Sequence, residues 1–395
     1  MLKQKIWSAA DIIGLAPDEL LDDLSSETGV DYSVKKLQGK HIFKLFLFAL
    51  LDRASISLRI LESIFKSDRF QNLFETKSKS IKHVALSFRL KTIKAEYFEK
   101  IFLYLIHSPK LEHIVFDRKK IKTSKIDTTI ITLSSKLLRL GMNDNPGYKT
   151  LKFGVELHQG IPVNMILFKE QKELSEDNAL PQLVMQSKQK KALNIAIFDR
   201  GIQRKQNFVD FQKAGIFFIS RLSTQKVKIV KSLPSTERQT PTLTILSDQI
   251  IRFQSSENIN PKDIDTEFRL VIGKNKDTKQ KIHFLTNVHF LSAIEITELY
   301  KSRWEIETFF KFIKQQLNFR HLLSRSENGI KVVMYLTMIA AILLTLYKKL
   351  NNIMGWTVAK IQFLDELYVG VKQNWQQEIQ IAFERRNATV YLNSS

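Results

Sequence analysis

Hydrophobic side chains recur three and four positions apart through roughly the first 110 residues, which is the spacing of one face of an α-helix. The repeat is clearest in three segments, GKHIFKLFLFALLD, SISLRILESIFKSDRF and AEYFEKIFLYLIH. Their polar positions carry Lys and Arg. The pattern therefore predicts an N-terminal region built of amphipathic helices.

The pattern changes to short alternating segments after His113. KIDTTIITL, YKTLKFGVELHQ and IPVNMILF are rich in β-branched residues and are separated by turn-forming residues such as Asn145-Pro146-Gly147, as expected of consecutive antiparallel strands. A helix around ALPQLVMQSKQK, a strand ALNIAIFD, a helix around QNFVDFQKA and a strand IFFISRL follow. Three strands followed by helix, strand, helix and strand is the order of a ribonuclease H-like mixed sheet, so the chain is predicted to be an α/β protein.

A second β-rich stretch interrupts this arrangement between about Ser223 and Asn287. TLTILSDQIIRF and EFRLVIGKNKDTKQKIHFLT read as strands. The stretch is too long for a loop and too short for a typical independent domain, so it is predicted to be an insertion into the sheet domain. Beyond it, Ser292 and Glu295 form an S-x-x-E capping box that opens a long predicted helix, AIEITELYKSRWEIETFFKFIKQQL.

Charge and composition narrow the possible partners. Lys and Arg total 61 against 40 acidic residues, a formal net charge of +21, which suits nucleic acid or an anionic membrane surface. The longest uncharged run, Val332 to Tyr347, is shorter than the roughly 20 residues of a membrane-spanning helix, so a buried core helix is predicted and nucleic acid is favoured. The chain has no Cys, which excludes disulfides and thiolate metal sites. No secretion signal opens the sequence, so no export is expected.

Four polar residues of the long predicted helix lie on one of its faces. Tyr300, Arg303, Glu307 and Lys314 share an arc of about 60° at helical spacing. One carboxylate would then lie among a phenol and two cations. A solvated helix face with ordinary ion pairs would give the same spacing, so periodicity alone leaves both interpretations open.

The residues around this face resemble a known signature. YKSRWEIETFFKFIK fits the Y-x2-R-x3-E-x6-K pattern of insertion-sequence DDE transposases of the IS-four-type family. FDRGIQRKQNFVDFQKAGIFFISRL is similar to the second-aspartate region of that family, and KIDTTIITL resembles its first-aspartate strand. The resemblance runs from about Lys122 to Leu323, and VKKLQGKHIFKLFLFALLD is similar to the opening helices of these proteins.

The resemblance implies that Asp127, Asp199 and Glu307 are catalytic carboxylates and metal ligands. Such a set can hold two Mg²⁺ ions about 4 Å apart around a phosphate, because magnesium prefers hard oxygen ligands. Mn²⁺ is the expected substitute. The resemblance further implies that the other three residues of the signature contact DNA; they are Tyr300, Arg303 and Lys314.

The chain is accordingly predicted to be a DNA transposase that binds terminal inverted repeats, cleaves DNA and transfers the 3′ ends to target DNA. A homodimer in the synaptic complex and a cytoplasmic, nucleoid-associated location are expected, and the short uncharged run leads us to expect no membrane partner. Two alternatives stay open. One is a metal-dependent nuclease of the same fold, and the other is an inactive copy that binds DNA ends as an inhibitor.

These inferences divide the chain into five predicted regions. They are a helical DNA-binding region at 1–115, the first part of the catalytic core at 116–222, the β insertion at 223–287, the second part of the core at 288–350, and a helical tail at 351–395.

Three smaller expectations concern single residues. Asp177 in SEDNAL is expected to be a helix N-cap rather than a ligand. His158 lies in a strand pattern and is expected to be structural. Some relatives stack a flipped base on a Trp of the β insertion; this insertion has none, so either the device is lacking here or another residue, such as Phe253 or Phe268, replaces the Trp.

Overall fold

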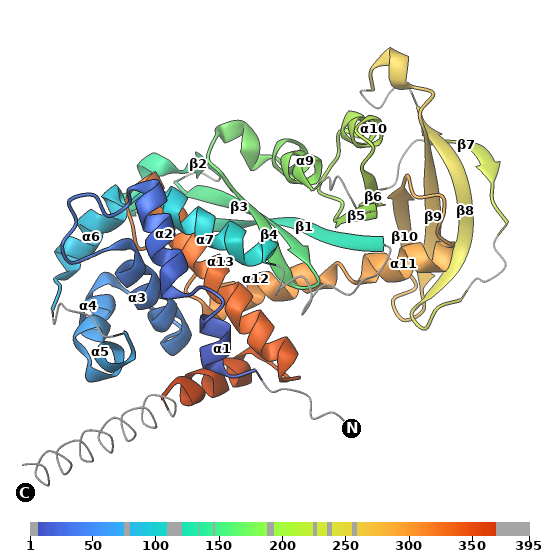
Figure 1. Cartoon of the computed structure of the whole chain (residues 1–395). Coiled ribbons are helices and arrows are strands. Elements are labelled where there is room, and N and C mark those ends of the chain that lie inside the picture. The colour runs from blue at the N-terminus through green and yellow to red at the C-terminus, as the bar shows by residue number, and fades with distance from the viewer. Residues whose placement is uncertain are drawn as a thin grey trace, which may run out of the picture. The chain divides into compact units, whose positions relative to one another are not determined.

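The computed structural model describes residues 7–74, 80–108, 121–133, 135–144, 147–187, 193–223, 227–234, 239–254 and 259–368. The chain folds into two compact units, one helical and one containing a large sheet (Figure 1). The helical unit comprises Met1–Val115 and Phe312–Ser395, and the sheet unit comprises Phe116–Lys311. The sequence predicts that residues 288–350 belong together, whereas the boundary between the two units follows Lys311.

The helical unit confirms the amphipathic pattern of the N-terminal region. The predicted helices GKHIFKLFLFALLD and AEYFEKIFLYLIH are α3 and α7. Residues 356–368 are also helical. The helices with described bounds in this unit are α1 (Ala9–Ile13), α2 (Asp18–Thr28), α3 (Gly39–Asp52), α4 (Leu58–Lys66), α5 (Asp68–Phe74), α6 (His83–Thr92), α7 (Ala95–His107) and α13 (Glu327–Leu350).

One predicted helix, SISLRILESIFKSDRF, is broken in two at Ser67. The backbone of Ser67 is extended, with φ −72° and ψ 141°, and its hydroxyl accepts a hydrogen bond from the N–H of Phe70 (3.3 Å). Ser67 therefore ends α4 and caps the start of α5. The hydrophobic periodicity of the sequence continues across Ser67, so it gave no sign of the break.

Helix α13 is the buried core helix that the sequence predicted. By length and composition it could span a membrane, but 89% of its most apolar window is buried inside the protein. It packs against α3, α6 and α7. The hydroxyl of Ser326 accepts from the N–H of Gly329 and caps its start. Its apolar side chains thus form the centre of the helical unit.

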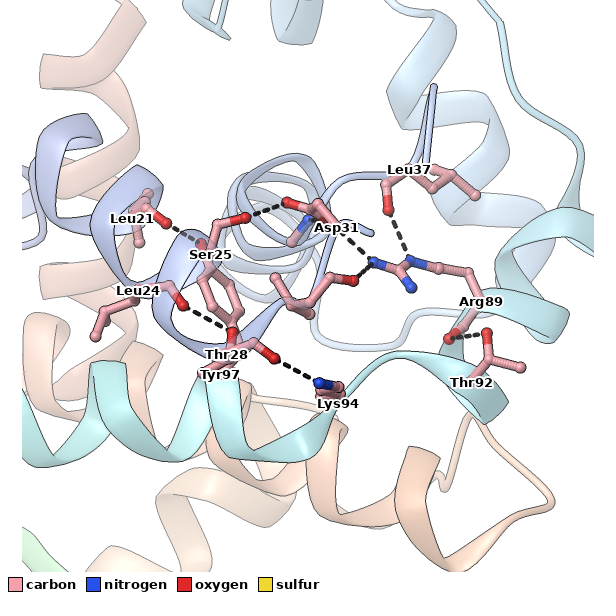
Figure 2. A network of polar contacts seen from close by, with 12 residues as sticks. Leu21, Leu24, Ser25, Thr28, Asp31, Leu37, Arg89, Thr92, Lys94 and Tyr97 are labelled. Carbon is pink, nitrogen blue, oxygen red and sulfur yellow. Dashed lines mark hydrogen bonds and ion pairs between the residues drawn. The ribbon is translucent and has the colours of Figure 1, made fainter. Parts of the chain in front are cut away.

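The loop between α2 and α3 is fixed by a buried arginine (Figure 2). The Arg89 guanidinium donates to the carbonyl oxygens of Leu37 (2.8 Å) and Val30 (2.9 Å) and to the carboxylate of Asp31 (3.0 Å). Asp31 also accepts from the backbone N–H of Gly39 at the start of α3 (2.7 Å). A buried charge is tolerated only when a partner and hydrogen bonds replace its hydration, so this network holds the loop in one conformation.

The sheet unit contains one ten-stranded mixed sheet within its described residues. The strand order is β2-β3-β1-β5-β6-β10-β9-β8-β7, and β4 pairs with β3. Strand β5 is parallel to β1 and β6 is parallel to β5, whereas the hairpin strands are antiparallel. The strands are β1 (Ile121–Thr132), β2 (Met142–Asn143), β3 (Lys149–His158), β4 (Ile161–Phe168), β5 (Leu193–Phe198), β6 (Phe217–Leu222), β7 (Val227–Ser232), β8 (Leu243–Phe253), β9 (Glu267–Asn275) and β10 (Lys281–Thr286). The path β4-β3-β1-β5-β6 is the ribonuclease H-like arrangement, and the predicted fold class is confirmed.

Helices cover both faces of this sheet (Figure 1). Ala196 and Phe198 of β5 lie in one core with residues of α9 (Glu176–Gln186) and α10 (Lys205–Lys213). The alternate residues Ile195 and Ile197 lie in a second core with residues of α11 (Ala293–Lys301). Since successive strand residues point to opposite faces, α9 and α10 cover one face and α11 covers the other.

The predicted β insertion continues the same sheet. Strand β10 pairs antiparallel with β6, and β9, β8 and β7 follow outward. Strand β7 was not predicted; most of its side chains are exposed. Phe253 and Phe268 are 3% and 0% exposed, with ring centroids 5.3 Å apart. The interpretation that either stacks a flipped base is wrong, because both rings are enclosed in the core.

Candidate active site

The two aspartates stand level with one another on neighbouring strands. Asp127 lies within β1, and Asp199 directly follows β5. The parallel register pairs Lys125 with Ile197. Continuing that register by two residues brings Asp199 level with Asp127. The backbone N–H of Thr128 donates to the Asp127 carboxylate (2.8 Å).

The long helix predicted after the capping box is two helices. The capping box itself is confirmed, with Ser292 and Glu295 hydrogen-bonded reciprocally. Helix α11 ends at Lys301 and α12 runs from Trp304 to Gln316. Between them, the N–H of Arg303 bonds to the Tyr300 carbonyl oxygen, three residues back. This tighter 3₁₀-type winding ends the α-helix, so the four signature residues do not share one continuous helical arc as predicted.

Two of the signature residues nevertheless contact the candidate catalytic carboxylates. The Tyr300 hydroxyl donates to Asp199 Oδ1 (3.0 Å). Arg303 is 7% exposed, and its guanidinium donates to Glu307 Oε1 (2.6 Å). The same guanidinium lies 5.6 Å from the centre of the Tyr300 ring. A phenol and one cation therefore bind the carboxylates of Asp199 and Glu307.

A buried lysine ties the Glu307 helix to the Asp127 strand. Lys125 is 4% exposed on β1, and its ammonium lies 3.4 Å from the carboxylate of Glu305 on α12. Lys125 and Asp127 are two residues apart on one strand, so their side chains share a face of the sheet. The pair helps to explain how α12 comes to lie over that face.

The aspartates differ in their electrostatic surroundings. Burial raises the pKa of the Asp127 carboxyl to about 7, although the N–H of Thr128 opposes the shift. Burial also acts to raise the pKa of Asp199, but the backbone N–H of Arg200 and the guanidinium of Arg303 outweigh it and hold that pKa below its usual value. Asp199 is thus stabilised as an anion, whereas at Asp127 the N–H of Thr128 and the charge of Arg303 do not offset the effect of burial.

This imbalance predicts that Asp127→Asn stabilises the metal-free protein. A carboxyl whose pKa is raised on folding binds more protons in the folded state, so its stability contribution falls as pH rises from about 4 to about 7. One pKa unit corresponds to about 1.4 kcal/mol, and after allowance for solvent reaching this half-buried group we expect a gain of about 2 kcal/mol at neutral pH. Thermal melts of wild type and variant at several pH values, with chelator, would test this. The advantage should shrink toward pH 4; a constant difference would contradict it.

The chain is similar in sequence to known transposases. A family model described as "Transposase DDE domain" matches residues 109–343, which include all three carboxylates. The chain belongs to this transposase family. It is 27% identical over 280 residues to the "Putative transposase for insertion sequence element IS4SA" of Synechocystis, a match covering 66% of this chain and 74% of that protein.

A second relative is similar over a shorter stretch. The chain is 29% identical over 170 residues to the "Putative transposase y4zB" of Sinorhizobium fredii, which covers 43% of this chain. The match spans 46% of that relative, so it covers less than half of its length. The predicted membership in the insertion-sequence DDE transposases is confirmed.

A divalent metal ion, which the family generally uses, fits the donor chemistry of the transposase. Asp127 and Asp199 offer hard carboxylate oxygens of the kind Mg²⁺ prefers. Asp127 is an incompletely compensated carboxylate, the environment that a cation would relieve. Among the described residues no group of three or more His, Cys, Asp or Glu is already arranged around a metal position. Glu307, whose carboxylate accepts from Arg303, would join the two aspartates as the third ligand.

The remaining signature residue, Lys314, is half-buried on α12. It falls in the helical unit, which begins at Phe312, rather than in the sheet unit that holds the carboxylates. Lys314 lies seven residues after Glu307 on the same helix, so the two side chains share one face of α12.

The structure contradicts the expectation for Asp177 and agrees with that for His158. Asp177 is not the N-cap of α9; Ser175 is, and Asp177 accepts from the backbone N–H groups of Gln203 and Arg204 (both 2.7 Å). Its carboxylate thus holds the turn after Asp199. His158 is buried and hydrogen-bonded to Ser124 (2.6 Å), which agrees with the predicted structural role.

The sequence interpretation missed two charged neighbours of the carboxylates. Arg221, near the end of β6, helps to lower the pKa of Asp199. Glu176, at the start of α9, acts on Asp127 in the opposite sense. Arg221 had a signal, because the second-aspartate region resembles a pattern whose strand ends in Arg. No signal in the sequence pointed to Glu176 beyond its position at the start of a predicted helix.

Proposed function

We propose that this chain is an insertion-sequence transposase that cleaves DNA at the terminal inverted repeats of its element and transfers the 3′ ends to target DNA. The observation that carries the proposal is the arrangement of Asp127, Asp199 and the Tyr300-Arg303-Glu307 segment within one ribonuclease H-like unit.

Each side chain has a distinct part in the proposed reaction. Asp127, Asp199 and Glu307 would hold two Mg²⁺ or Mn²⁺ ions, which activate the attacking oxygen and stabilise the leaving oxygen of a phosphate. Tyr300 remains a hydrogen-bond donor because burial raises the pKa of its hydroxyl, and it fixes the orientation of Asp199.

Arg303 is suited to positioning the DNA. Its Nε is buried and has no hydrogen-bond partner among the described residues, although Nη2 binds Glu307. An unpaired buried donor carries a free-energy penalty that a phosphate oxygen would remove. Arginine binds phosphate through a planar set of donors, so Arg303 would hold the strand beside the carboxylates without being a metal ligand.

The positive charge of the chain suits it to binding DNA. With a net charge of +21, phosphate contacts would supply much of the affinity for DNA. The helical region 1–115 is proposed to bind the element ends, and Lys314 to add a further phosphate contact. Residues 116–222 and 288–350 would carry catalysis, with 223–287 as the insertion and 351–395 as the tail. A homodimeric synaptic complex on the bacterial nucleoid, in the cytoplasm, completes the proposal.

A strand-transfer assay tests this function against both alternatives. The purified chain would be incubated with Mg²⁺, a pre-cut DNA end carrying the inverted repeat that flanks its gene, and a supercoiled target plasmid. We expect joined products that depend on the repeat sequence. Cleavage without joining would favour a nuclease, and repeat-specific binding without cleavage would favour an inactive end-binding copy.

A further inference from the structure

Glu176 connects the first residue of α9 to two strands of the sheet. Its Oε1 accepts from the Thr128 hydroxyl (2.6 Å) on β1 and lies 3.1 Å from the ammonium of Lys152 on β3. Thr128 in turn donates its backbone N–H to Asp127. Only two hydrogen bonds therefore separate the Glu176 carboxylate from that of Asp127.

The same side chain packs on the turn that follows Asp199. A Cβ atom placed on Gly201 would lie 3.0 Å from Cγ of Glu176, so the glycine permits an approach that a larger residue would oppose. The adjacent Asp177 binds the backbone N–H groups of Gln203 and Arg204 at the far end of this turn. The first turn of α9 thus contacts both segments that carry a catalytic aspartate.

The second carboxylate oxygen of Glu176 is the unexplained part of this arrangement. Oε2 is buried and has no hydrogen-bond partner among the described residues. The ion pair with Lys152, whose side chain is 1% exposed, involves Oε1. A role as counter-ion to Lys152 therefore accounts for one oxygen only, and leaving the other buried and unpaired is unfavourable unless a cation compensates for it.

We propose that Glu176 is a positioning residue of the active site, which aligns Asp127 with the turn after Asp199 and adds the negative charge that favours a divalent cation between them. This inference rests on the proposed function. Glu176 acts through Thr128 and through its charge, and no direct coordination of the ion is needed.

The test is the Mn²⁺ affinity of the DNA-free protein, measured by calorimetry on Glu176→Gln. Glutamine keeps the size and the acceptor oxygen but removes the charge. Loss of a group that orients metal ligands typically weakens metal binding roughly ten- to a hundred-fold, which is the expected result. Cleavage should need correspondingly more metal for half its maximal rate, while the rate at saturating metal falls less than about tenfold. Unchanged Mn²⁺ affinity would overturn the proposal.

A double variant separates positioning from a purely structural role. Glu176→Gln leaves buried Lys152 without a counter-ion and is expected to lower the melting temperature. Adding Lys152→Met removes that unpaired charge and should restore the melting temperature, while Mn²⁺ affinity stays low. If affinity returned together with stability, Glu176 would be only the partner of Lys152. Glu298→Gln, on an exposed position of α11, is the matched control and should behave as wild type.

The same assay distinguishes failure of this inference from failure of the proposed function. Asp127→Asn should weaken Mn²⁺ binding at least as much as Glu176→Gln. If Asp127→Asn lowers the affinity and Glu176→Gln does not, only the role of Glu176 is refuted. If neither changes it, the metal site itself is refuted, and the role of Glu176 with it.

Discussion

Asp127→Asn, Asp199→Asn and Glu307→Gln should each reduce metal-dependent DNA cleavage by at least about a thousand-fold, because residues that act as one catalytic unit lose most of its effect when any member is removed. Each substitution preserves the size of the side chain, and Asp199→Asn leaves an acceptor for the Tyr300 hydroxyl. DNA-end binding should stay within a few-fold of wild type, since removing negative charge does not weaken attraction to phosphate. Cleavage of a radiolabelled inverted-repeat end and gel-shift affinity would be measured on the same preparations.

Each of the three variants tests its own residue as a metal ligand. A variant that cleaves at near-normal rate excludes its residue from the metal site, whatever the other two do. Glu305→Gln is the control for disruption of α12, since Glu305 lies only two residues from Glu307 and pairs with Lys125. We expect it to retain most of the cleavage activity. Equal losses in Glu305→Gln and Glu307→Gln would point to disruption of α12 instead of loss of a ligand.

Arg303→Ala should lower cleavage and strand transfer by about a hundred-fold without lowering the Mn²⁺ affinity of the DNA-free protein. Loss of a charge-assisted hydrogen bond to phosphate typically costs about 1.5 to 3 kcal/mol, or roughly ten- to a hundred-fold. The upper end applies here because Arg303 is buried and its Nε is unpaired. Metal affinity should not fall, since the substitution frees the carboxylate of Glu307.

The melting temperature of Arg303→Ala gives an independent test of the ion pair between Arg303 and Glu307. Arg303→Ala leaves the Glu307 carboxylate, whose side chain is 35% exposed, without its partner, so the variant should melt at a lower temperature than wild type, with a loss well below the roughly 3 kcal/mol of a fully buried pair. Lys301→Ala removes a nearby positive charge from an exposed position and is the control for net charge. If Arg303→Ala and Lys301→Ala cleaved equally well, Arg303 would be a structural partner of Glu307 and nothing more.

Local features of the sequence anticipated much of the fold. Alternating β-branched segments gave strands β1, β3 and β4, and the S-x-x-E capping box marked the start of α11 correctly. These features depend on interactions within a few residues, so the sequence contains them directly. The break at Ser67 and the one before Trp304 were missed, because hydrophobic spacing continues across both.

The candidate site was only partly accessible from sequence. Motif resemblance singled out the two aspartates and Glu307, but only the structure shows that β1 and β5 are parallel neighbours, which brings the two aspartates close. The contacts of Lys125 with Glu305 and of Glu176 with Thr128 join residues 180 and 48 positions apart. No local pattern encodes such pairs, because they arise only when the sheet and its covering helices have packed.

The sequence by itself determined the ribonuclease H-like order of elements and the buried character of α13, which follow from periodicity and turn residues, and its resemblance to a transposase signature pointed to the candidate site residues. Only the tertiary structure decided that Phe253 and Phe268 are core residues, that Arg303 binds Glu307 in a turn between two helices, and that Asp127 is the under-compensated carboxylate. The physical reason is that burial, and with it the energy of a charge or an exposed ring, depends on what the rest of the chain places around a residue.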